Sequence, residues 1–172
     1  FVGKLSYFKV INGSVKTDAK FINMRTGEEE KIGKVMWLKA GKQEDADVIN
    51  AGDIGSVAKL VNVRTGDTLC AAGSGVEIVV SEFPKACLSM AVKVLKKGEE
   101  EKVSNGLARL CEEDPTLSFA TDKETRELVL SGLGEQHLDV VSSKLKNKFG
   151  VEIKLEIPKV AYRETIRKKV KV

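Results

Sequence analysis

The sequence predicts two small domains, an all-β unit over residues 1–84 followed by an α+β unit over residues 85–158. Turn-forming residues recur about every ten positions in the first half without helical periodicity, which is typical of a sandwich or a small barrel. In the second half, some segments show the apolar alternation of strands and others show helical spacing. The chain is long enough for two such units.

The first unit begins with a strand pattern at residues 5–11 and a tight turn at Asn12-Gly13, where both residues tolerate positive φ. Residues 64–69 close this unit, and residues 71–84 are predicted to connect it to the second, with residues 76–80 as an alternative last strand. Further strands are expected at residues 19–22 and 31–38, with loops at residues 23–27 and 41–43, and residues 48–53 then turn into a strand at residues 54–60.

The first part of the second unit is a strand followed by a helix. Apolar residues alternate with small or polar ones over residues 88–94, and residues 99–111 have helical spacing. Three glutamates lie in the first helical turn, where the helix dipole favours anions. Asp114-Pro115 ends the helix, because proline disfavours helical geometry in the residue before it.

A hairpin, a helix and a strand complete the second unit. The hairpin strands lie around residues 117–119 and 128–130, with a polar turn between them. Gly132-Leu133-Gly134 then opens a helix with apolar residues up to Phe149, and a strand covers residues 151–157. The order β-α-β-β-α-β is that of a ferredoxin-like domain, a four-stranded sheet with two helices on one face.

Composition excludes several classes of protein. The hydrophobic fraction of 42% fits a globular chain, and no apolar run approaches the roughly 20 residues of a membrane helix, so no membrane partner is expected. The three cysteines show neither metal nor disulfide spacing, which favours the reducing cytoplasm. Because the sequence starts at Phe1 and ends in a basic run, we expect a piece of a longer protein.

No catalytic residue, cofactor site or metal site is predicted. The single histidine, His137, lies near the apolar face of the second helix, where it either packs at the helix start or contacts a partner. The glycine turn before it could accept an anion, but His137 stands where a dinucleotide fingerprint needs its third glycine. Glu112-Glu113-Asp114 is expected to be solvated charge at a helix end.

Several motifs together resemble one known family. Glu112-Glu113-Asp114-Pro115-Thr116, Gly132-Leu133-Gly134-Glu135-Gln136-His137-Leu138 and Pro158-Lys159-Val160-Ala161-Tyr162-Arg163-Glu164-Thr165-Ile166 are similar to the third domain of bacterial elongation factor G and the entry into its fourth. Ala51-Gly52-Asp53-Ile54 and Thr65-Gly66-Asp67-Thr68-Leu69 resemble the second-domain barrel of translational GTPases. The resemblance implies a translation-factor barrel, then a ferredoxin-like domain, with the basic tail at residues 159–172 starting a further domain.

The sequence departs from the family pattern at a few positions. The family usually has glycine at Lys59 and Arg126, methionine at Leu133, leucine at Gln136 and glutamate at Asp139. These departures favour a divergent elongation-factor-G-like paralogue over the housekeeping factor. A ribosomal protection protein of the tetracycline-resistance type is a further alternative.

The resemblance implies a non-catalytic middle fragment of a ribosome-dependent GTPase that acts in translocation. GTP and magnesium would then bind an upstream domain, and the full-length parent would hydrolyse GTP. The barrel would touch ribosomal RNA, and the ferredoxin-like domain would relay the nucleotide state. Expected partners are the ribosome, the upstream GTPase domain and the downstream domains of the same chain.

Two groups of residues are candidate contacts under this hypothesis. Loop cations suit RNA phosphates, although each one alone could be a solvated surface charge: Lys16, Arg25, Lys42, Lys59 and Arg64. The segment that matches the family's fusidic-acid-sensitive region supplies candidate interdomain contacts: Gly132, Gly134, Glu135, Gln136 and His137.

Two other classes of function are alternatives. An enzyme of the acylphosphatase kind would need an arginine in the loop after the first strand of the second unit, and that loop has Lys96 and Lys97 instead. A stand-alone RNA-binding module would use the first unit and the basic tail, which holds six basic side chains and one acidic one.

Overall fold

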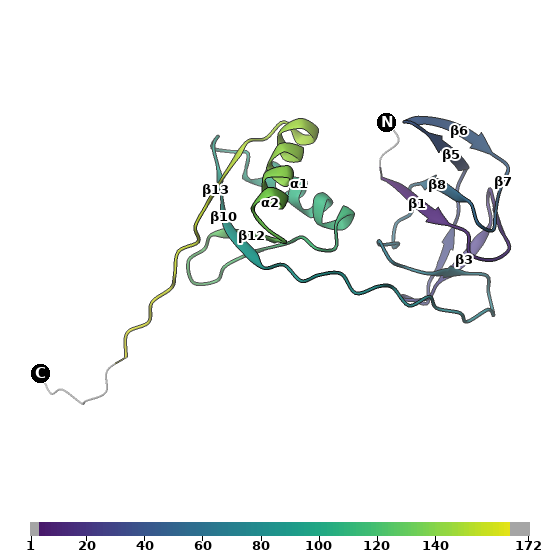
Figure 1. Cartoon of the computed structure of the whole chain (residues 1–172), viewed down its shortest axis with the longest axis horizontal. Helices are drawn as coiled ribbons and strands as arrows, with labels where there is room; N and C mark the ends of the chain where they lie inside the picture. Colours follow the sequence, from purple (N-terminus) through teal and green to yellow (C-terminus); the bar gives the residue numbers. More distant parts are fainter. Residues whose placement is uncertain (1–3, 166–172) are drawn as a thin grey trace, which may run out of the picture. The chain divides into compact units, whose positions relative to one another are not determined.

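The computed structural model describes residues 4–165 (Figure 1). The chain divides into two compact units between Val80 and Ser81, and each unit is described by itself. As predicted, the chain is mostly β-strand with few helices. Within the described residues, no helix combines the length and the apolar composition that crossing a membrane requires.

The first unit consists of short strands, and its described residues contain no helix. The strands are β1 (Leu5–Lys9), β2 (Ser14–Lys16), β3 (Lys20–Asn23), β4 (Glu29–Lys31), β5 (Val35–Lys39), β6 (Lys42–Ala46), β7 (Val48–Asn50), β8 (Ile54–Ala58) and β9 (Leu69–Cys70). They form antiparallel sheets with the orders β1-β8-β5-β6, β2-β7 and β4-β3-β9. The sheets enclose an apolar core: Val10, Ile32, Val35, Ala46, Ile49, Val57 and Leu60.

Two predicted boundaries in the first unit are wrong. The single strand expected over residues 31–38 is divided into β4 and β5, because the chain leaves the β3 sheet near Gly33 and joins β8. The loop expected over residues 41–43 is a tighter turn at Ala40 and Gly41, both at positive φ. Lys42 therefore already belongs to β6, paired with Lys39. The alternative strand at residues 76–80 is not formed.

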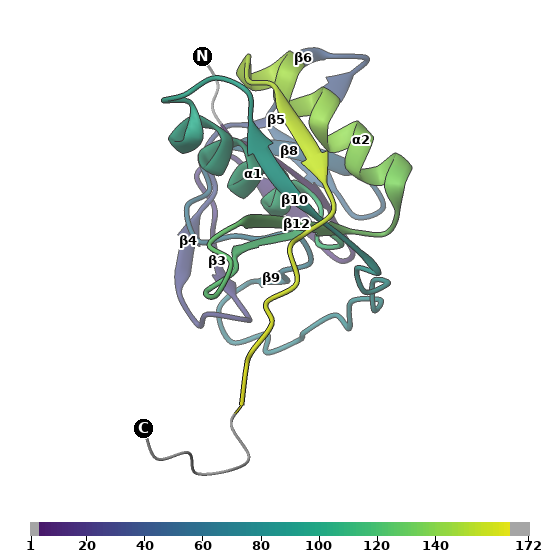
Figure 2. The ribbon, with the colours of Figure 1, turned by 90° about the vertical axis from the view of Figure 1, so that its left-hand side faces the viewer.

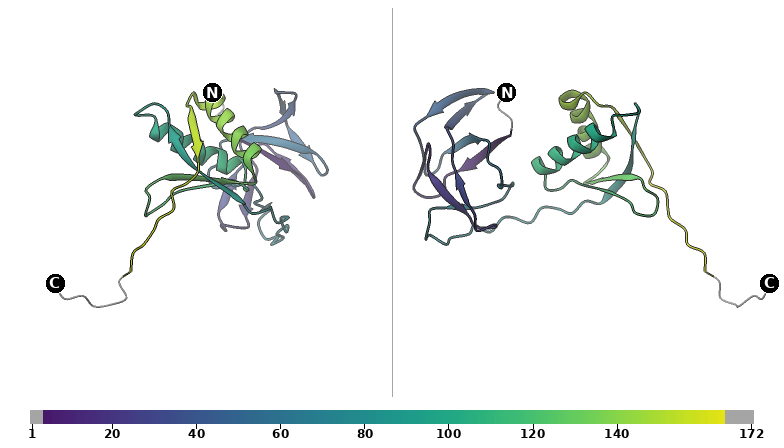
Figure 3. Two further views of the ribbon diagram at one scale, coloured as in Figure 1. Left: turned by 60° about the vertical axis from the view of Figure 1, so that its left-hand side comes forward. Right: turned by 180° about the vertical axis from the view of Figure 1, so that it is seen from behind.

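The second unit follows the predicted order of elements. Its elements are β10 (Leu88–Val94), α1 (Glu100–Glu113), β11 (Ser118–Thr121), β12 (Leu128–Gly132), α2 (Glu135–Lys144), the π-helix η1 (Leu145–Phe149) and β13 (Ile153–Glu156). The sheet order is β11-β12-β10-β13, and all neighbours are antiparallel. Seen from the sheet side, β10 and β13 lie in front of the helices (Figure 2). Further views show α1 and α2 on the same face (Figure 3).

The core of the second unit lies between this sheet and the helices. It contains Val92, Val103, Leu107, Leu110, Leu117, Leu130, Leu138, Val141, Leu145, Val151 and Ile153. The helix α1 ends at Asp114, as Asp114-Pro115 predicted. The second helix winds into η1 before Gly150, at φ 67°, ends it in the left-handed conformation. The apolar spacing did not predict this change to π-helix.

Candidate functional site

The turn Gly132-Leu133-Gly134 joins the end of β12 to the start of α2. The backbone N–H of Leu133 donates to Nδ1 of His137 at 3.1 Å, and Nε2 of the ring lies 3.0 Å from Oδ2 of Asp114. Because Nδ1 accepts a bond, the ring proton sits on Nε2 and is donated to Asp114. The His137 side chain, which is 19% exposed, therefore links the turn to the end of α1 through two hydrogen bonds.

The carboxylate of Asp114 is engaged on both oxygens. Its Oδ1 accepts the backbone N–H and the hydroxyl of Thr116, at 2.9 and 2.6 Å. Burial by itself would raise the pKa of Asp114, but the hydrogen bonds from Thr116 and His137 outweigh it and leave that pKa below its ordinary value. The expectation of solvated charge is thus wrong for Asp114, which links two motifs that are distant in the sequence. The sequence Asp-Pro-Thr after a helix could have indicated the local bonds to Thr116, but it carries no signal for the bond to His137.

The candidate interdomain contacts occupy two kinds of position. Gly132 is buried, and a Cβ there would lie 2.8 Å from Cδ2 of Leu138 and 3.1 Å from Nδ1 of His137. Gly132 and His137 therefore hold the turn from inside. Gly134 is half-buried with open space beside it, and Glu135 and Gln136 are exposed. Glu135 and Gln136 are therefore the most accessible of the five candidate contacts, while Gly134 and His137 are accessible only in part.

A shallow depression lies beside the exposed part of this turn. Glu135 and Asp139 supply carboxylates to it, and the rest of its lining is apolar: Leu88, Met90, Leu138 and Leu155. Leu133 and Val140, 38% and 51% exposed, add apolar surface on the same turn and helix. The exposed thiol of Cys87 lies against the same turn, where it donates to the carbonyl of Leu133 at 2.9 Å. This face therefore offers mainly apolar surface with two carboxylates and one thiol.

A carboxylate of the chain already accepts a hydrogen bond just before α1. The backbone N–H of Gly98 donates to Oε2 of Glu100 at 2.8 Å, so a negative charge of the helix itself lies beside this loop. Lys96 and Lys97 are exposed in the same loop. This geometry counts against the acylphosphatase alternative.

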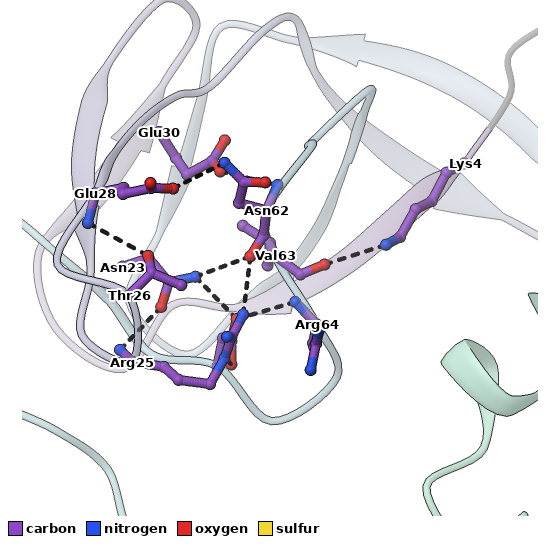
Figure 4. A network of polar contacts seen from close by, with 10 residues as sticks. Lys4, Asn23, Arg25, Thr26, Glu28, Glu30, Asn62, Val63 and Arg64 are labelled. Carbon is purple, nitrogen blue, oxygen red and sulfur yellow. Dashed lines mark hydrogen bonds and ion pairs between the residues drawn. The ribbon is translucent and has the colours of Figure 1, made fainter. Parts of the chain in front are cut away.

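The first unit contains a polar network between two loops (Figure 4). Asn23, fully buried, donates to Asp67 at 2.8 Å and to the carbonyl of Asn62 at 3.3 Å. Arg25 binds both oxygens of Asp67, at 2.7 and 2.9 Å, and also the carbonyl of Asn62. The backbone N–H of Arg64 donates to Asp67 as well. The network fastens residues 23–28 to residues 62–67.

Arg25 sets the charge state of Asp67. Its hydrogen bonds lower the pKa of Asp67 to about 2, against the opposing effect of burial, with further help from the Arg64 N–H and Asn23. The Asp67 side chain is 5% exposed and that of Arg25 is 40% exposed, so the pair is shielded on the carboxylate side only. Arg25 is thus paired within the unit and still has an exposed side chain.

The other four candidate cations are exposed and have no ion pair among the described residues. Lys16 ends β2 and Lys42 begins β6, so the expectation that both lie in loops is wrong. Lys59 and Arg64 do lie in loops. All four are exposed, and no ion pair within residues 4–165 involves their side chains. By contrast, Lys39 is paired with Glu44.

Part of the basic tail lies against the hairpin turn of the second unit. The backbone N–H of Lys159 donates to Glu127 at 2.9 Å, and its ammonium lies 3.6 Å from the same carboxylate. Arg163 pairs with Glu124. These two cations are therefore partly neutralised, whereas the remaining basic residues of the tail, Arg167, Lys168, Lys169 and Lys171, lie outside the described residues.

Each of the two units matches a model of a known protein domain. The family model described as elongation factor G domain 2 matches residues 1–72, and that described as elongation factor G, domain III matches residues 83–157. The chain belongs to the elongation factor G family. It matches the second and third domains of that family, in the family's order. In residues 4–165, no cluster of histidine, cysteine or acidic side chains could hold a metal ion.

Individual elongation factor G sequences agree with the family models. The chain is 40% identical to elongation factor G of Thermotoga maritima over 168 residues, and 39% identical to that of Salinibacter ruber over 166 residues. These alignments cover 98% and 96% of this chain but only 24% of each relative. A crystal structure of a protein from Thermus thermophilus matches with a TM-score of 0.86 and 26% identity, covering 98% of this chain and 25% of that one.

Two departures from the elongation factor G pattern fall on unusual backbone. Lys59 and Arg126, where the family usually has glycine, have φ angles of 66° and 57°. This left-handed region suits glycine and strains other residues. Both turns therefore hold a side chain that fits this backbone conformation less well than glycine would.

Proposed function

We propose that this chain is the non-catalytic middle part of a ribosome-dependent translational GTPase of the elongation factor G type, acting in translocation in the cytoplasm. Consecutive matches to the second and third domains, in the family's order, are the observation that carries the proposal. The first unit is then a translation-factor barrel and the second a ferredoxin-like domain, in keeping with its sheet order β11-β12-β10-β13. GTP and magnesium belong to an upstream domain of the same protein.

The first unit supplies a docking surface for ribosomal RNA. Lys16, Lys42, Lys59 and Arg64 are exposed, and the ion pairs described within residues 4–165 leave them unneutralised. Such side chains bind phosphates, with an affinity that falls as salt rises. Arg25 acts indirectly, because its bonds to Asp67 fix the loop that carries Arg64.

The second unit relays the nucleotide state between neighbouring domains. A relay needs a rigid body with a defined contact point, and rigid-body movement is a common form of switching. The bonds among His137, Asp114 and Thr116 fix the glycine turn to the ends of α1 and β12. Gly134, Glu135 and Gln136 then form the surface that an adjacent domain contacts.

Binding measurements on the 172-residue chain test this proposal. Sedimentation with ribosomes at two salt concentrations should show binding that weakens as salt rises and exceeds binding to random RNA of equal length. A titration with GTP and magnesium should show no saturable binding. Equal binding to both RNAs would support the stand-alone RNA-binding alternative, and tight GTP binding would refute the proposal outright.

A further inference from the structure

One backbone residue of the glycine turn in the second unit is held by two side chains. The N–H of Leu133 donates to Nδ1 of His137 at 3.1 Å, and the carbonyl of Leu133 accepts the thiol of Cys87 at 2.9 Å. The preceding residue is held by backbone instead, because the carbonyl of Gly132 accepts the N–H of Cys87 at 3.0 Å. The position of Leu133 therefore depends on the chemical state of an imidazole and a thiol.

The bond between Leu133 and His137 fits only the neutral form of the ring. A histidine nitrogen that accepts a hydrogen bond carries no proton, whereas both nitrogens of the protonated ring are donors. A proton on Nδ1 would face the N–H of Leu133, and two donors 3.1 Å apart do not bond. The ring also has neighbours on both sides, since a Cβ on Gly132 would lie 3.1 Å from Nδ1 and Asp114 binds Nε2.

The charges around the ring favour its protonated form. Asp114 lies 3.0 Å from Nε2, and its pKa is below the ordinary value, so this carboxylate stays ionised in mildly acid solution. Proton uptake by the ring would exchange the bond to Leu133 for a charge-assisted bond to Asp114, which is the stronger kind. The other titratable groups on the neighbouring elements are Glu112 and Glu113 on α1, Cys87 before β10, and Glu135 and Asp139 on α2.

We propose that protonation of His137 releases Leu133 and makes the glycine turn a pH-sensitive latch. Imidazole is the side chain that ordinarily changes its charge between about pH 5 and 8. The carbonyl of Gly134 accepts the N–H of Leu138 at 3.2 Å, so the release is confined to Leu133 and leaves α2 folded. The apolar side chain of Leu133 then moves next to Glu135. Its effect on a contact with an adjacent domain rests on the proposed function, whereas the release itself does not.

An NMR titration of the 172-residue chain from about pH 8 to about pH 5 tests the latch. His137 is the only histidine, so its ring resonances report the proton uptake, and the amide resonance of Leu133 should shift with the same midpoint. Protection of the Leu133 N–H from exchange should fall at least about tenfold, while that of Leu138 should stay within about twofold. A ring that titrates without a change at Leu133, or a ring that stays neutral throughout, would overturn the proposal.

Two variants separate the latch from general effects of acid. Asp114→Asn removes the charge that favours the protonated ring, so the midpoints of His137 and Leu133 should move to lower pH together. His137→Gln takes up no proton and should remove the pH dependence of the Leu133 amide, with circular dichroism showing that the helices remain. A Leu133 titration that persists in His137→Gln would contradict the latch. Neither ribosome nor nucleotide takes part, so these outcomes are independent of those that test the proposed function.

Discussion

At the scale of single residues, two partly buried carboxylates hold neighbouring segments of the chain together through hydrogen bonds. Asp67 and Asp114 each accept several hydrogen bonds that connect segments distant in the sequence. The pKa of each carboxyl lies below its ordinary value, because these hydrogen bonds outweigh the effect of burial. Neither network could be read from sequence spacing, since their partners lie far along the chain. Arg25 is an example: its loop position predicted a phosphate contact, which stays a prediction, and did not predict its bonds to Asp67.

We expect Asp67→Asn to destabilise the first unit by roughly 2 kcal/mol at pH 7. The pKa of Asp67 falls from 3.8 to about 2 on folding, and each unit is worth about 1.4 kcal/mol. The folded-state pKa is the lower one, so this stability is present above about pH 4 and is lost as the pH falls toward 2. Urea unfolding followed by Trp37 fluorescence measures it.

The exposed pair of Lys39 and Glu44 provides the control for Asp67. Glu44→Gln should change the unfolding free energy by less than about 1 kcal/mol. If the two variants are equally stable at pH 7, or if the Asp67→Asn difference persists unchanged at pH 2.5, the assigned role of Asp67 is wrong.

Arg126→Gly should stabilise the second unit by about 0.5–1 kcal/mol, because Arg126 is held at φ 57°. Lys123→Gly, in the same exposed turn at ordinary φ, should instead lower stability slightly. The helices described lie in the second unit, so urea unfolding followed by far-ultraviolet circular dichroism reports on it. A loss of stability in Arg126→Gly equal to that in Lys123→Gly would refute the argument.

At the scale of elements, close side-chain packing and the residues at helix ends determine where the helices and strands of the second unit begin and end. The strand-helix order, the hairpin and the stop at Asp114 followed from apolar spacing and from proline. The π-helix and the burial of Gly132 could not be predicted from these patterns, because both depend on contacts between segments that are distant in the sequence. The same limit explains the errors at residues 31–38 and 41–43, where a change of sheet partner and a two-residue turn overrode local pattern.

Gly106→Ala should destabilise the second unit by about 1–3 kcal/mol, although alanine is the better helix former. A Cβ at Gly106 would lie 2.7 Å from Cδ2 of the buried Leu145 and 3.3 Å from Phe149. Asn105→Ala, on the exposed face of α1, should be neutral or stabilising. Circular dichroism during urea unfolding measures both, and a more stable Gly106→Ala variant would show that α1 and η1 are not tightly packed.

A double-mutant cycle between His137→Ala and Asp114→Ala should give a coupling energy of about 1 kcal/mol or more, since the bond joins the ring to a charged acceptor. The matched cycle between Lys148 and Glu113, an exposed pair, should give less than about 0.5 kcal/mol. Equal couplings would mean that His137 does not link α1 to the glycine turn.

At the scale of the whole molecule, the described residues form two units that match consecutive domains of one family. The family and the mostly-β architecture could be predicted from motifs in the sequence, and the comparisons confirm the family. Which cations lack an ion pair among the described residues could not be predicted, because pairing depends on cross-strand neighbours. Lys39 and Lys42 lie opposite each other, but only Lys39 has a carboxylate beside it.

The central claim is most directly tested by ribosome binding of two charge-matched variants. One replaces the unpaired cations Lys16, Lys42, Lys59 and Arg64 with alanine, and the other replaces four paired ones, Lys20, Lys31, Lys34 and Lys39. The net charge changes equally, so we expect the first variant to lose at least tenfold in ribosome affinity at low salt and the second to lose much less. Equal losses, or no binding by the unmodified chain, would contradict the proposal that these four unpaired cations bind the ribosome.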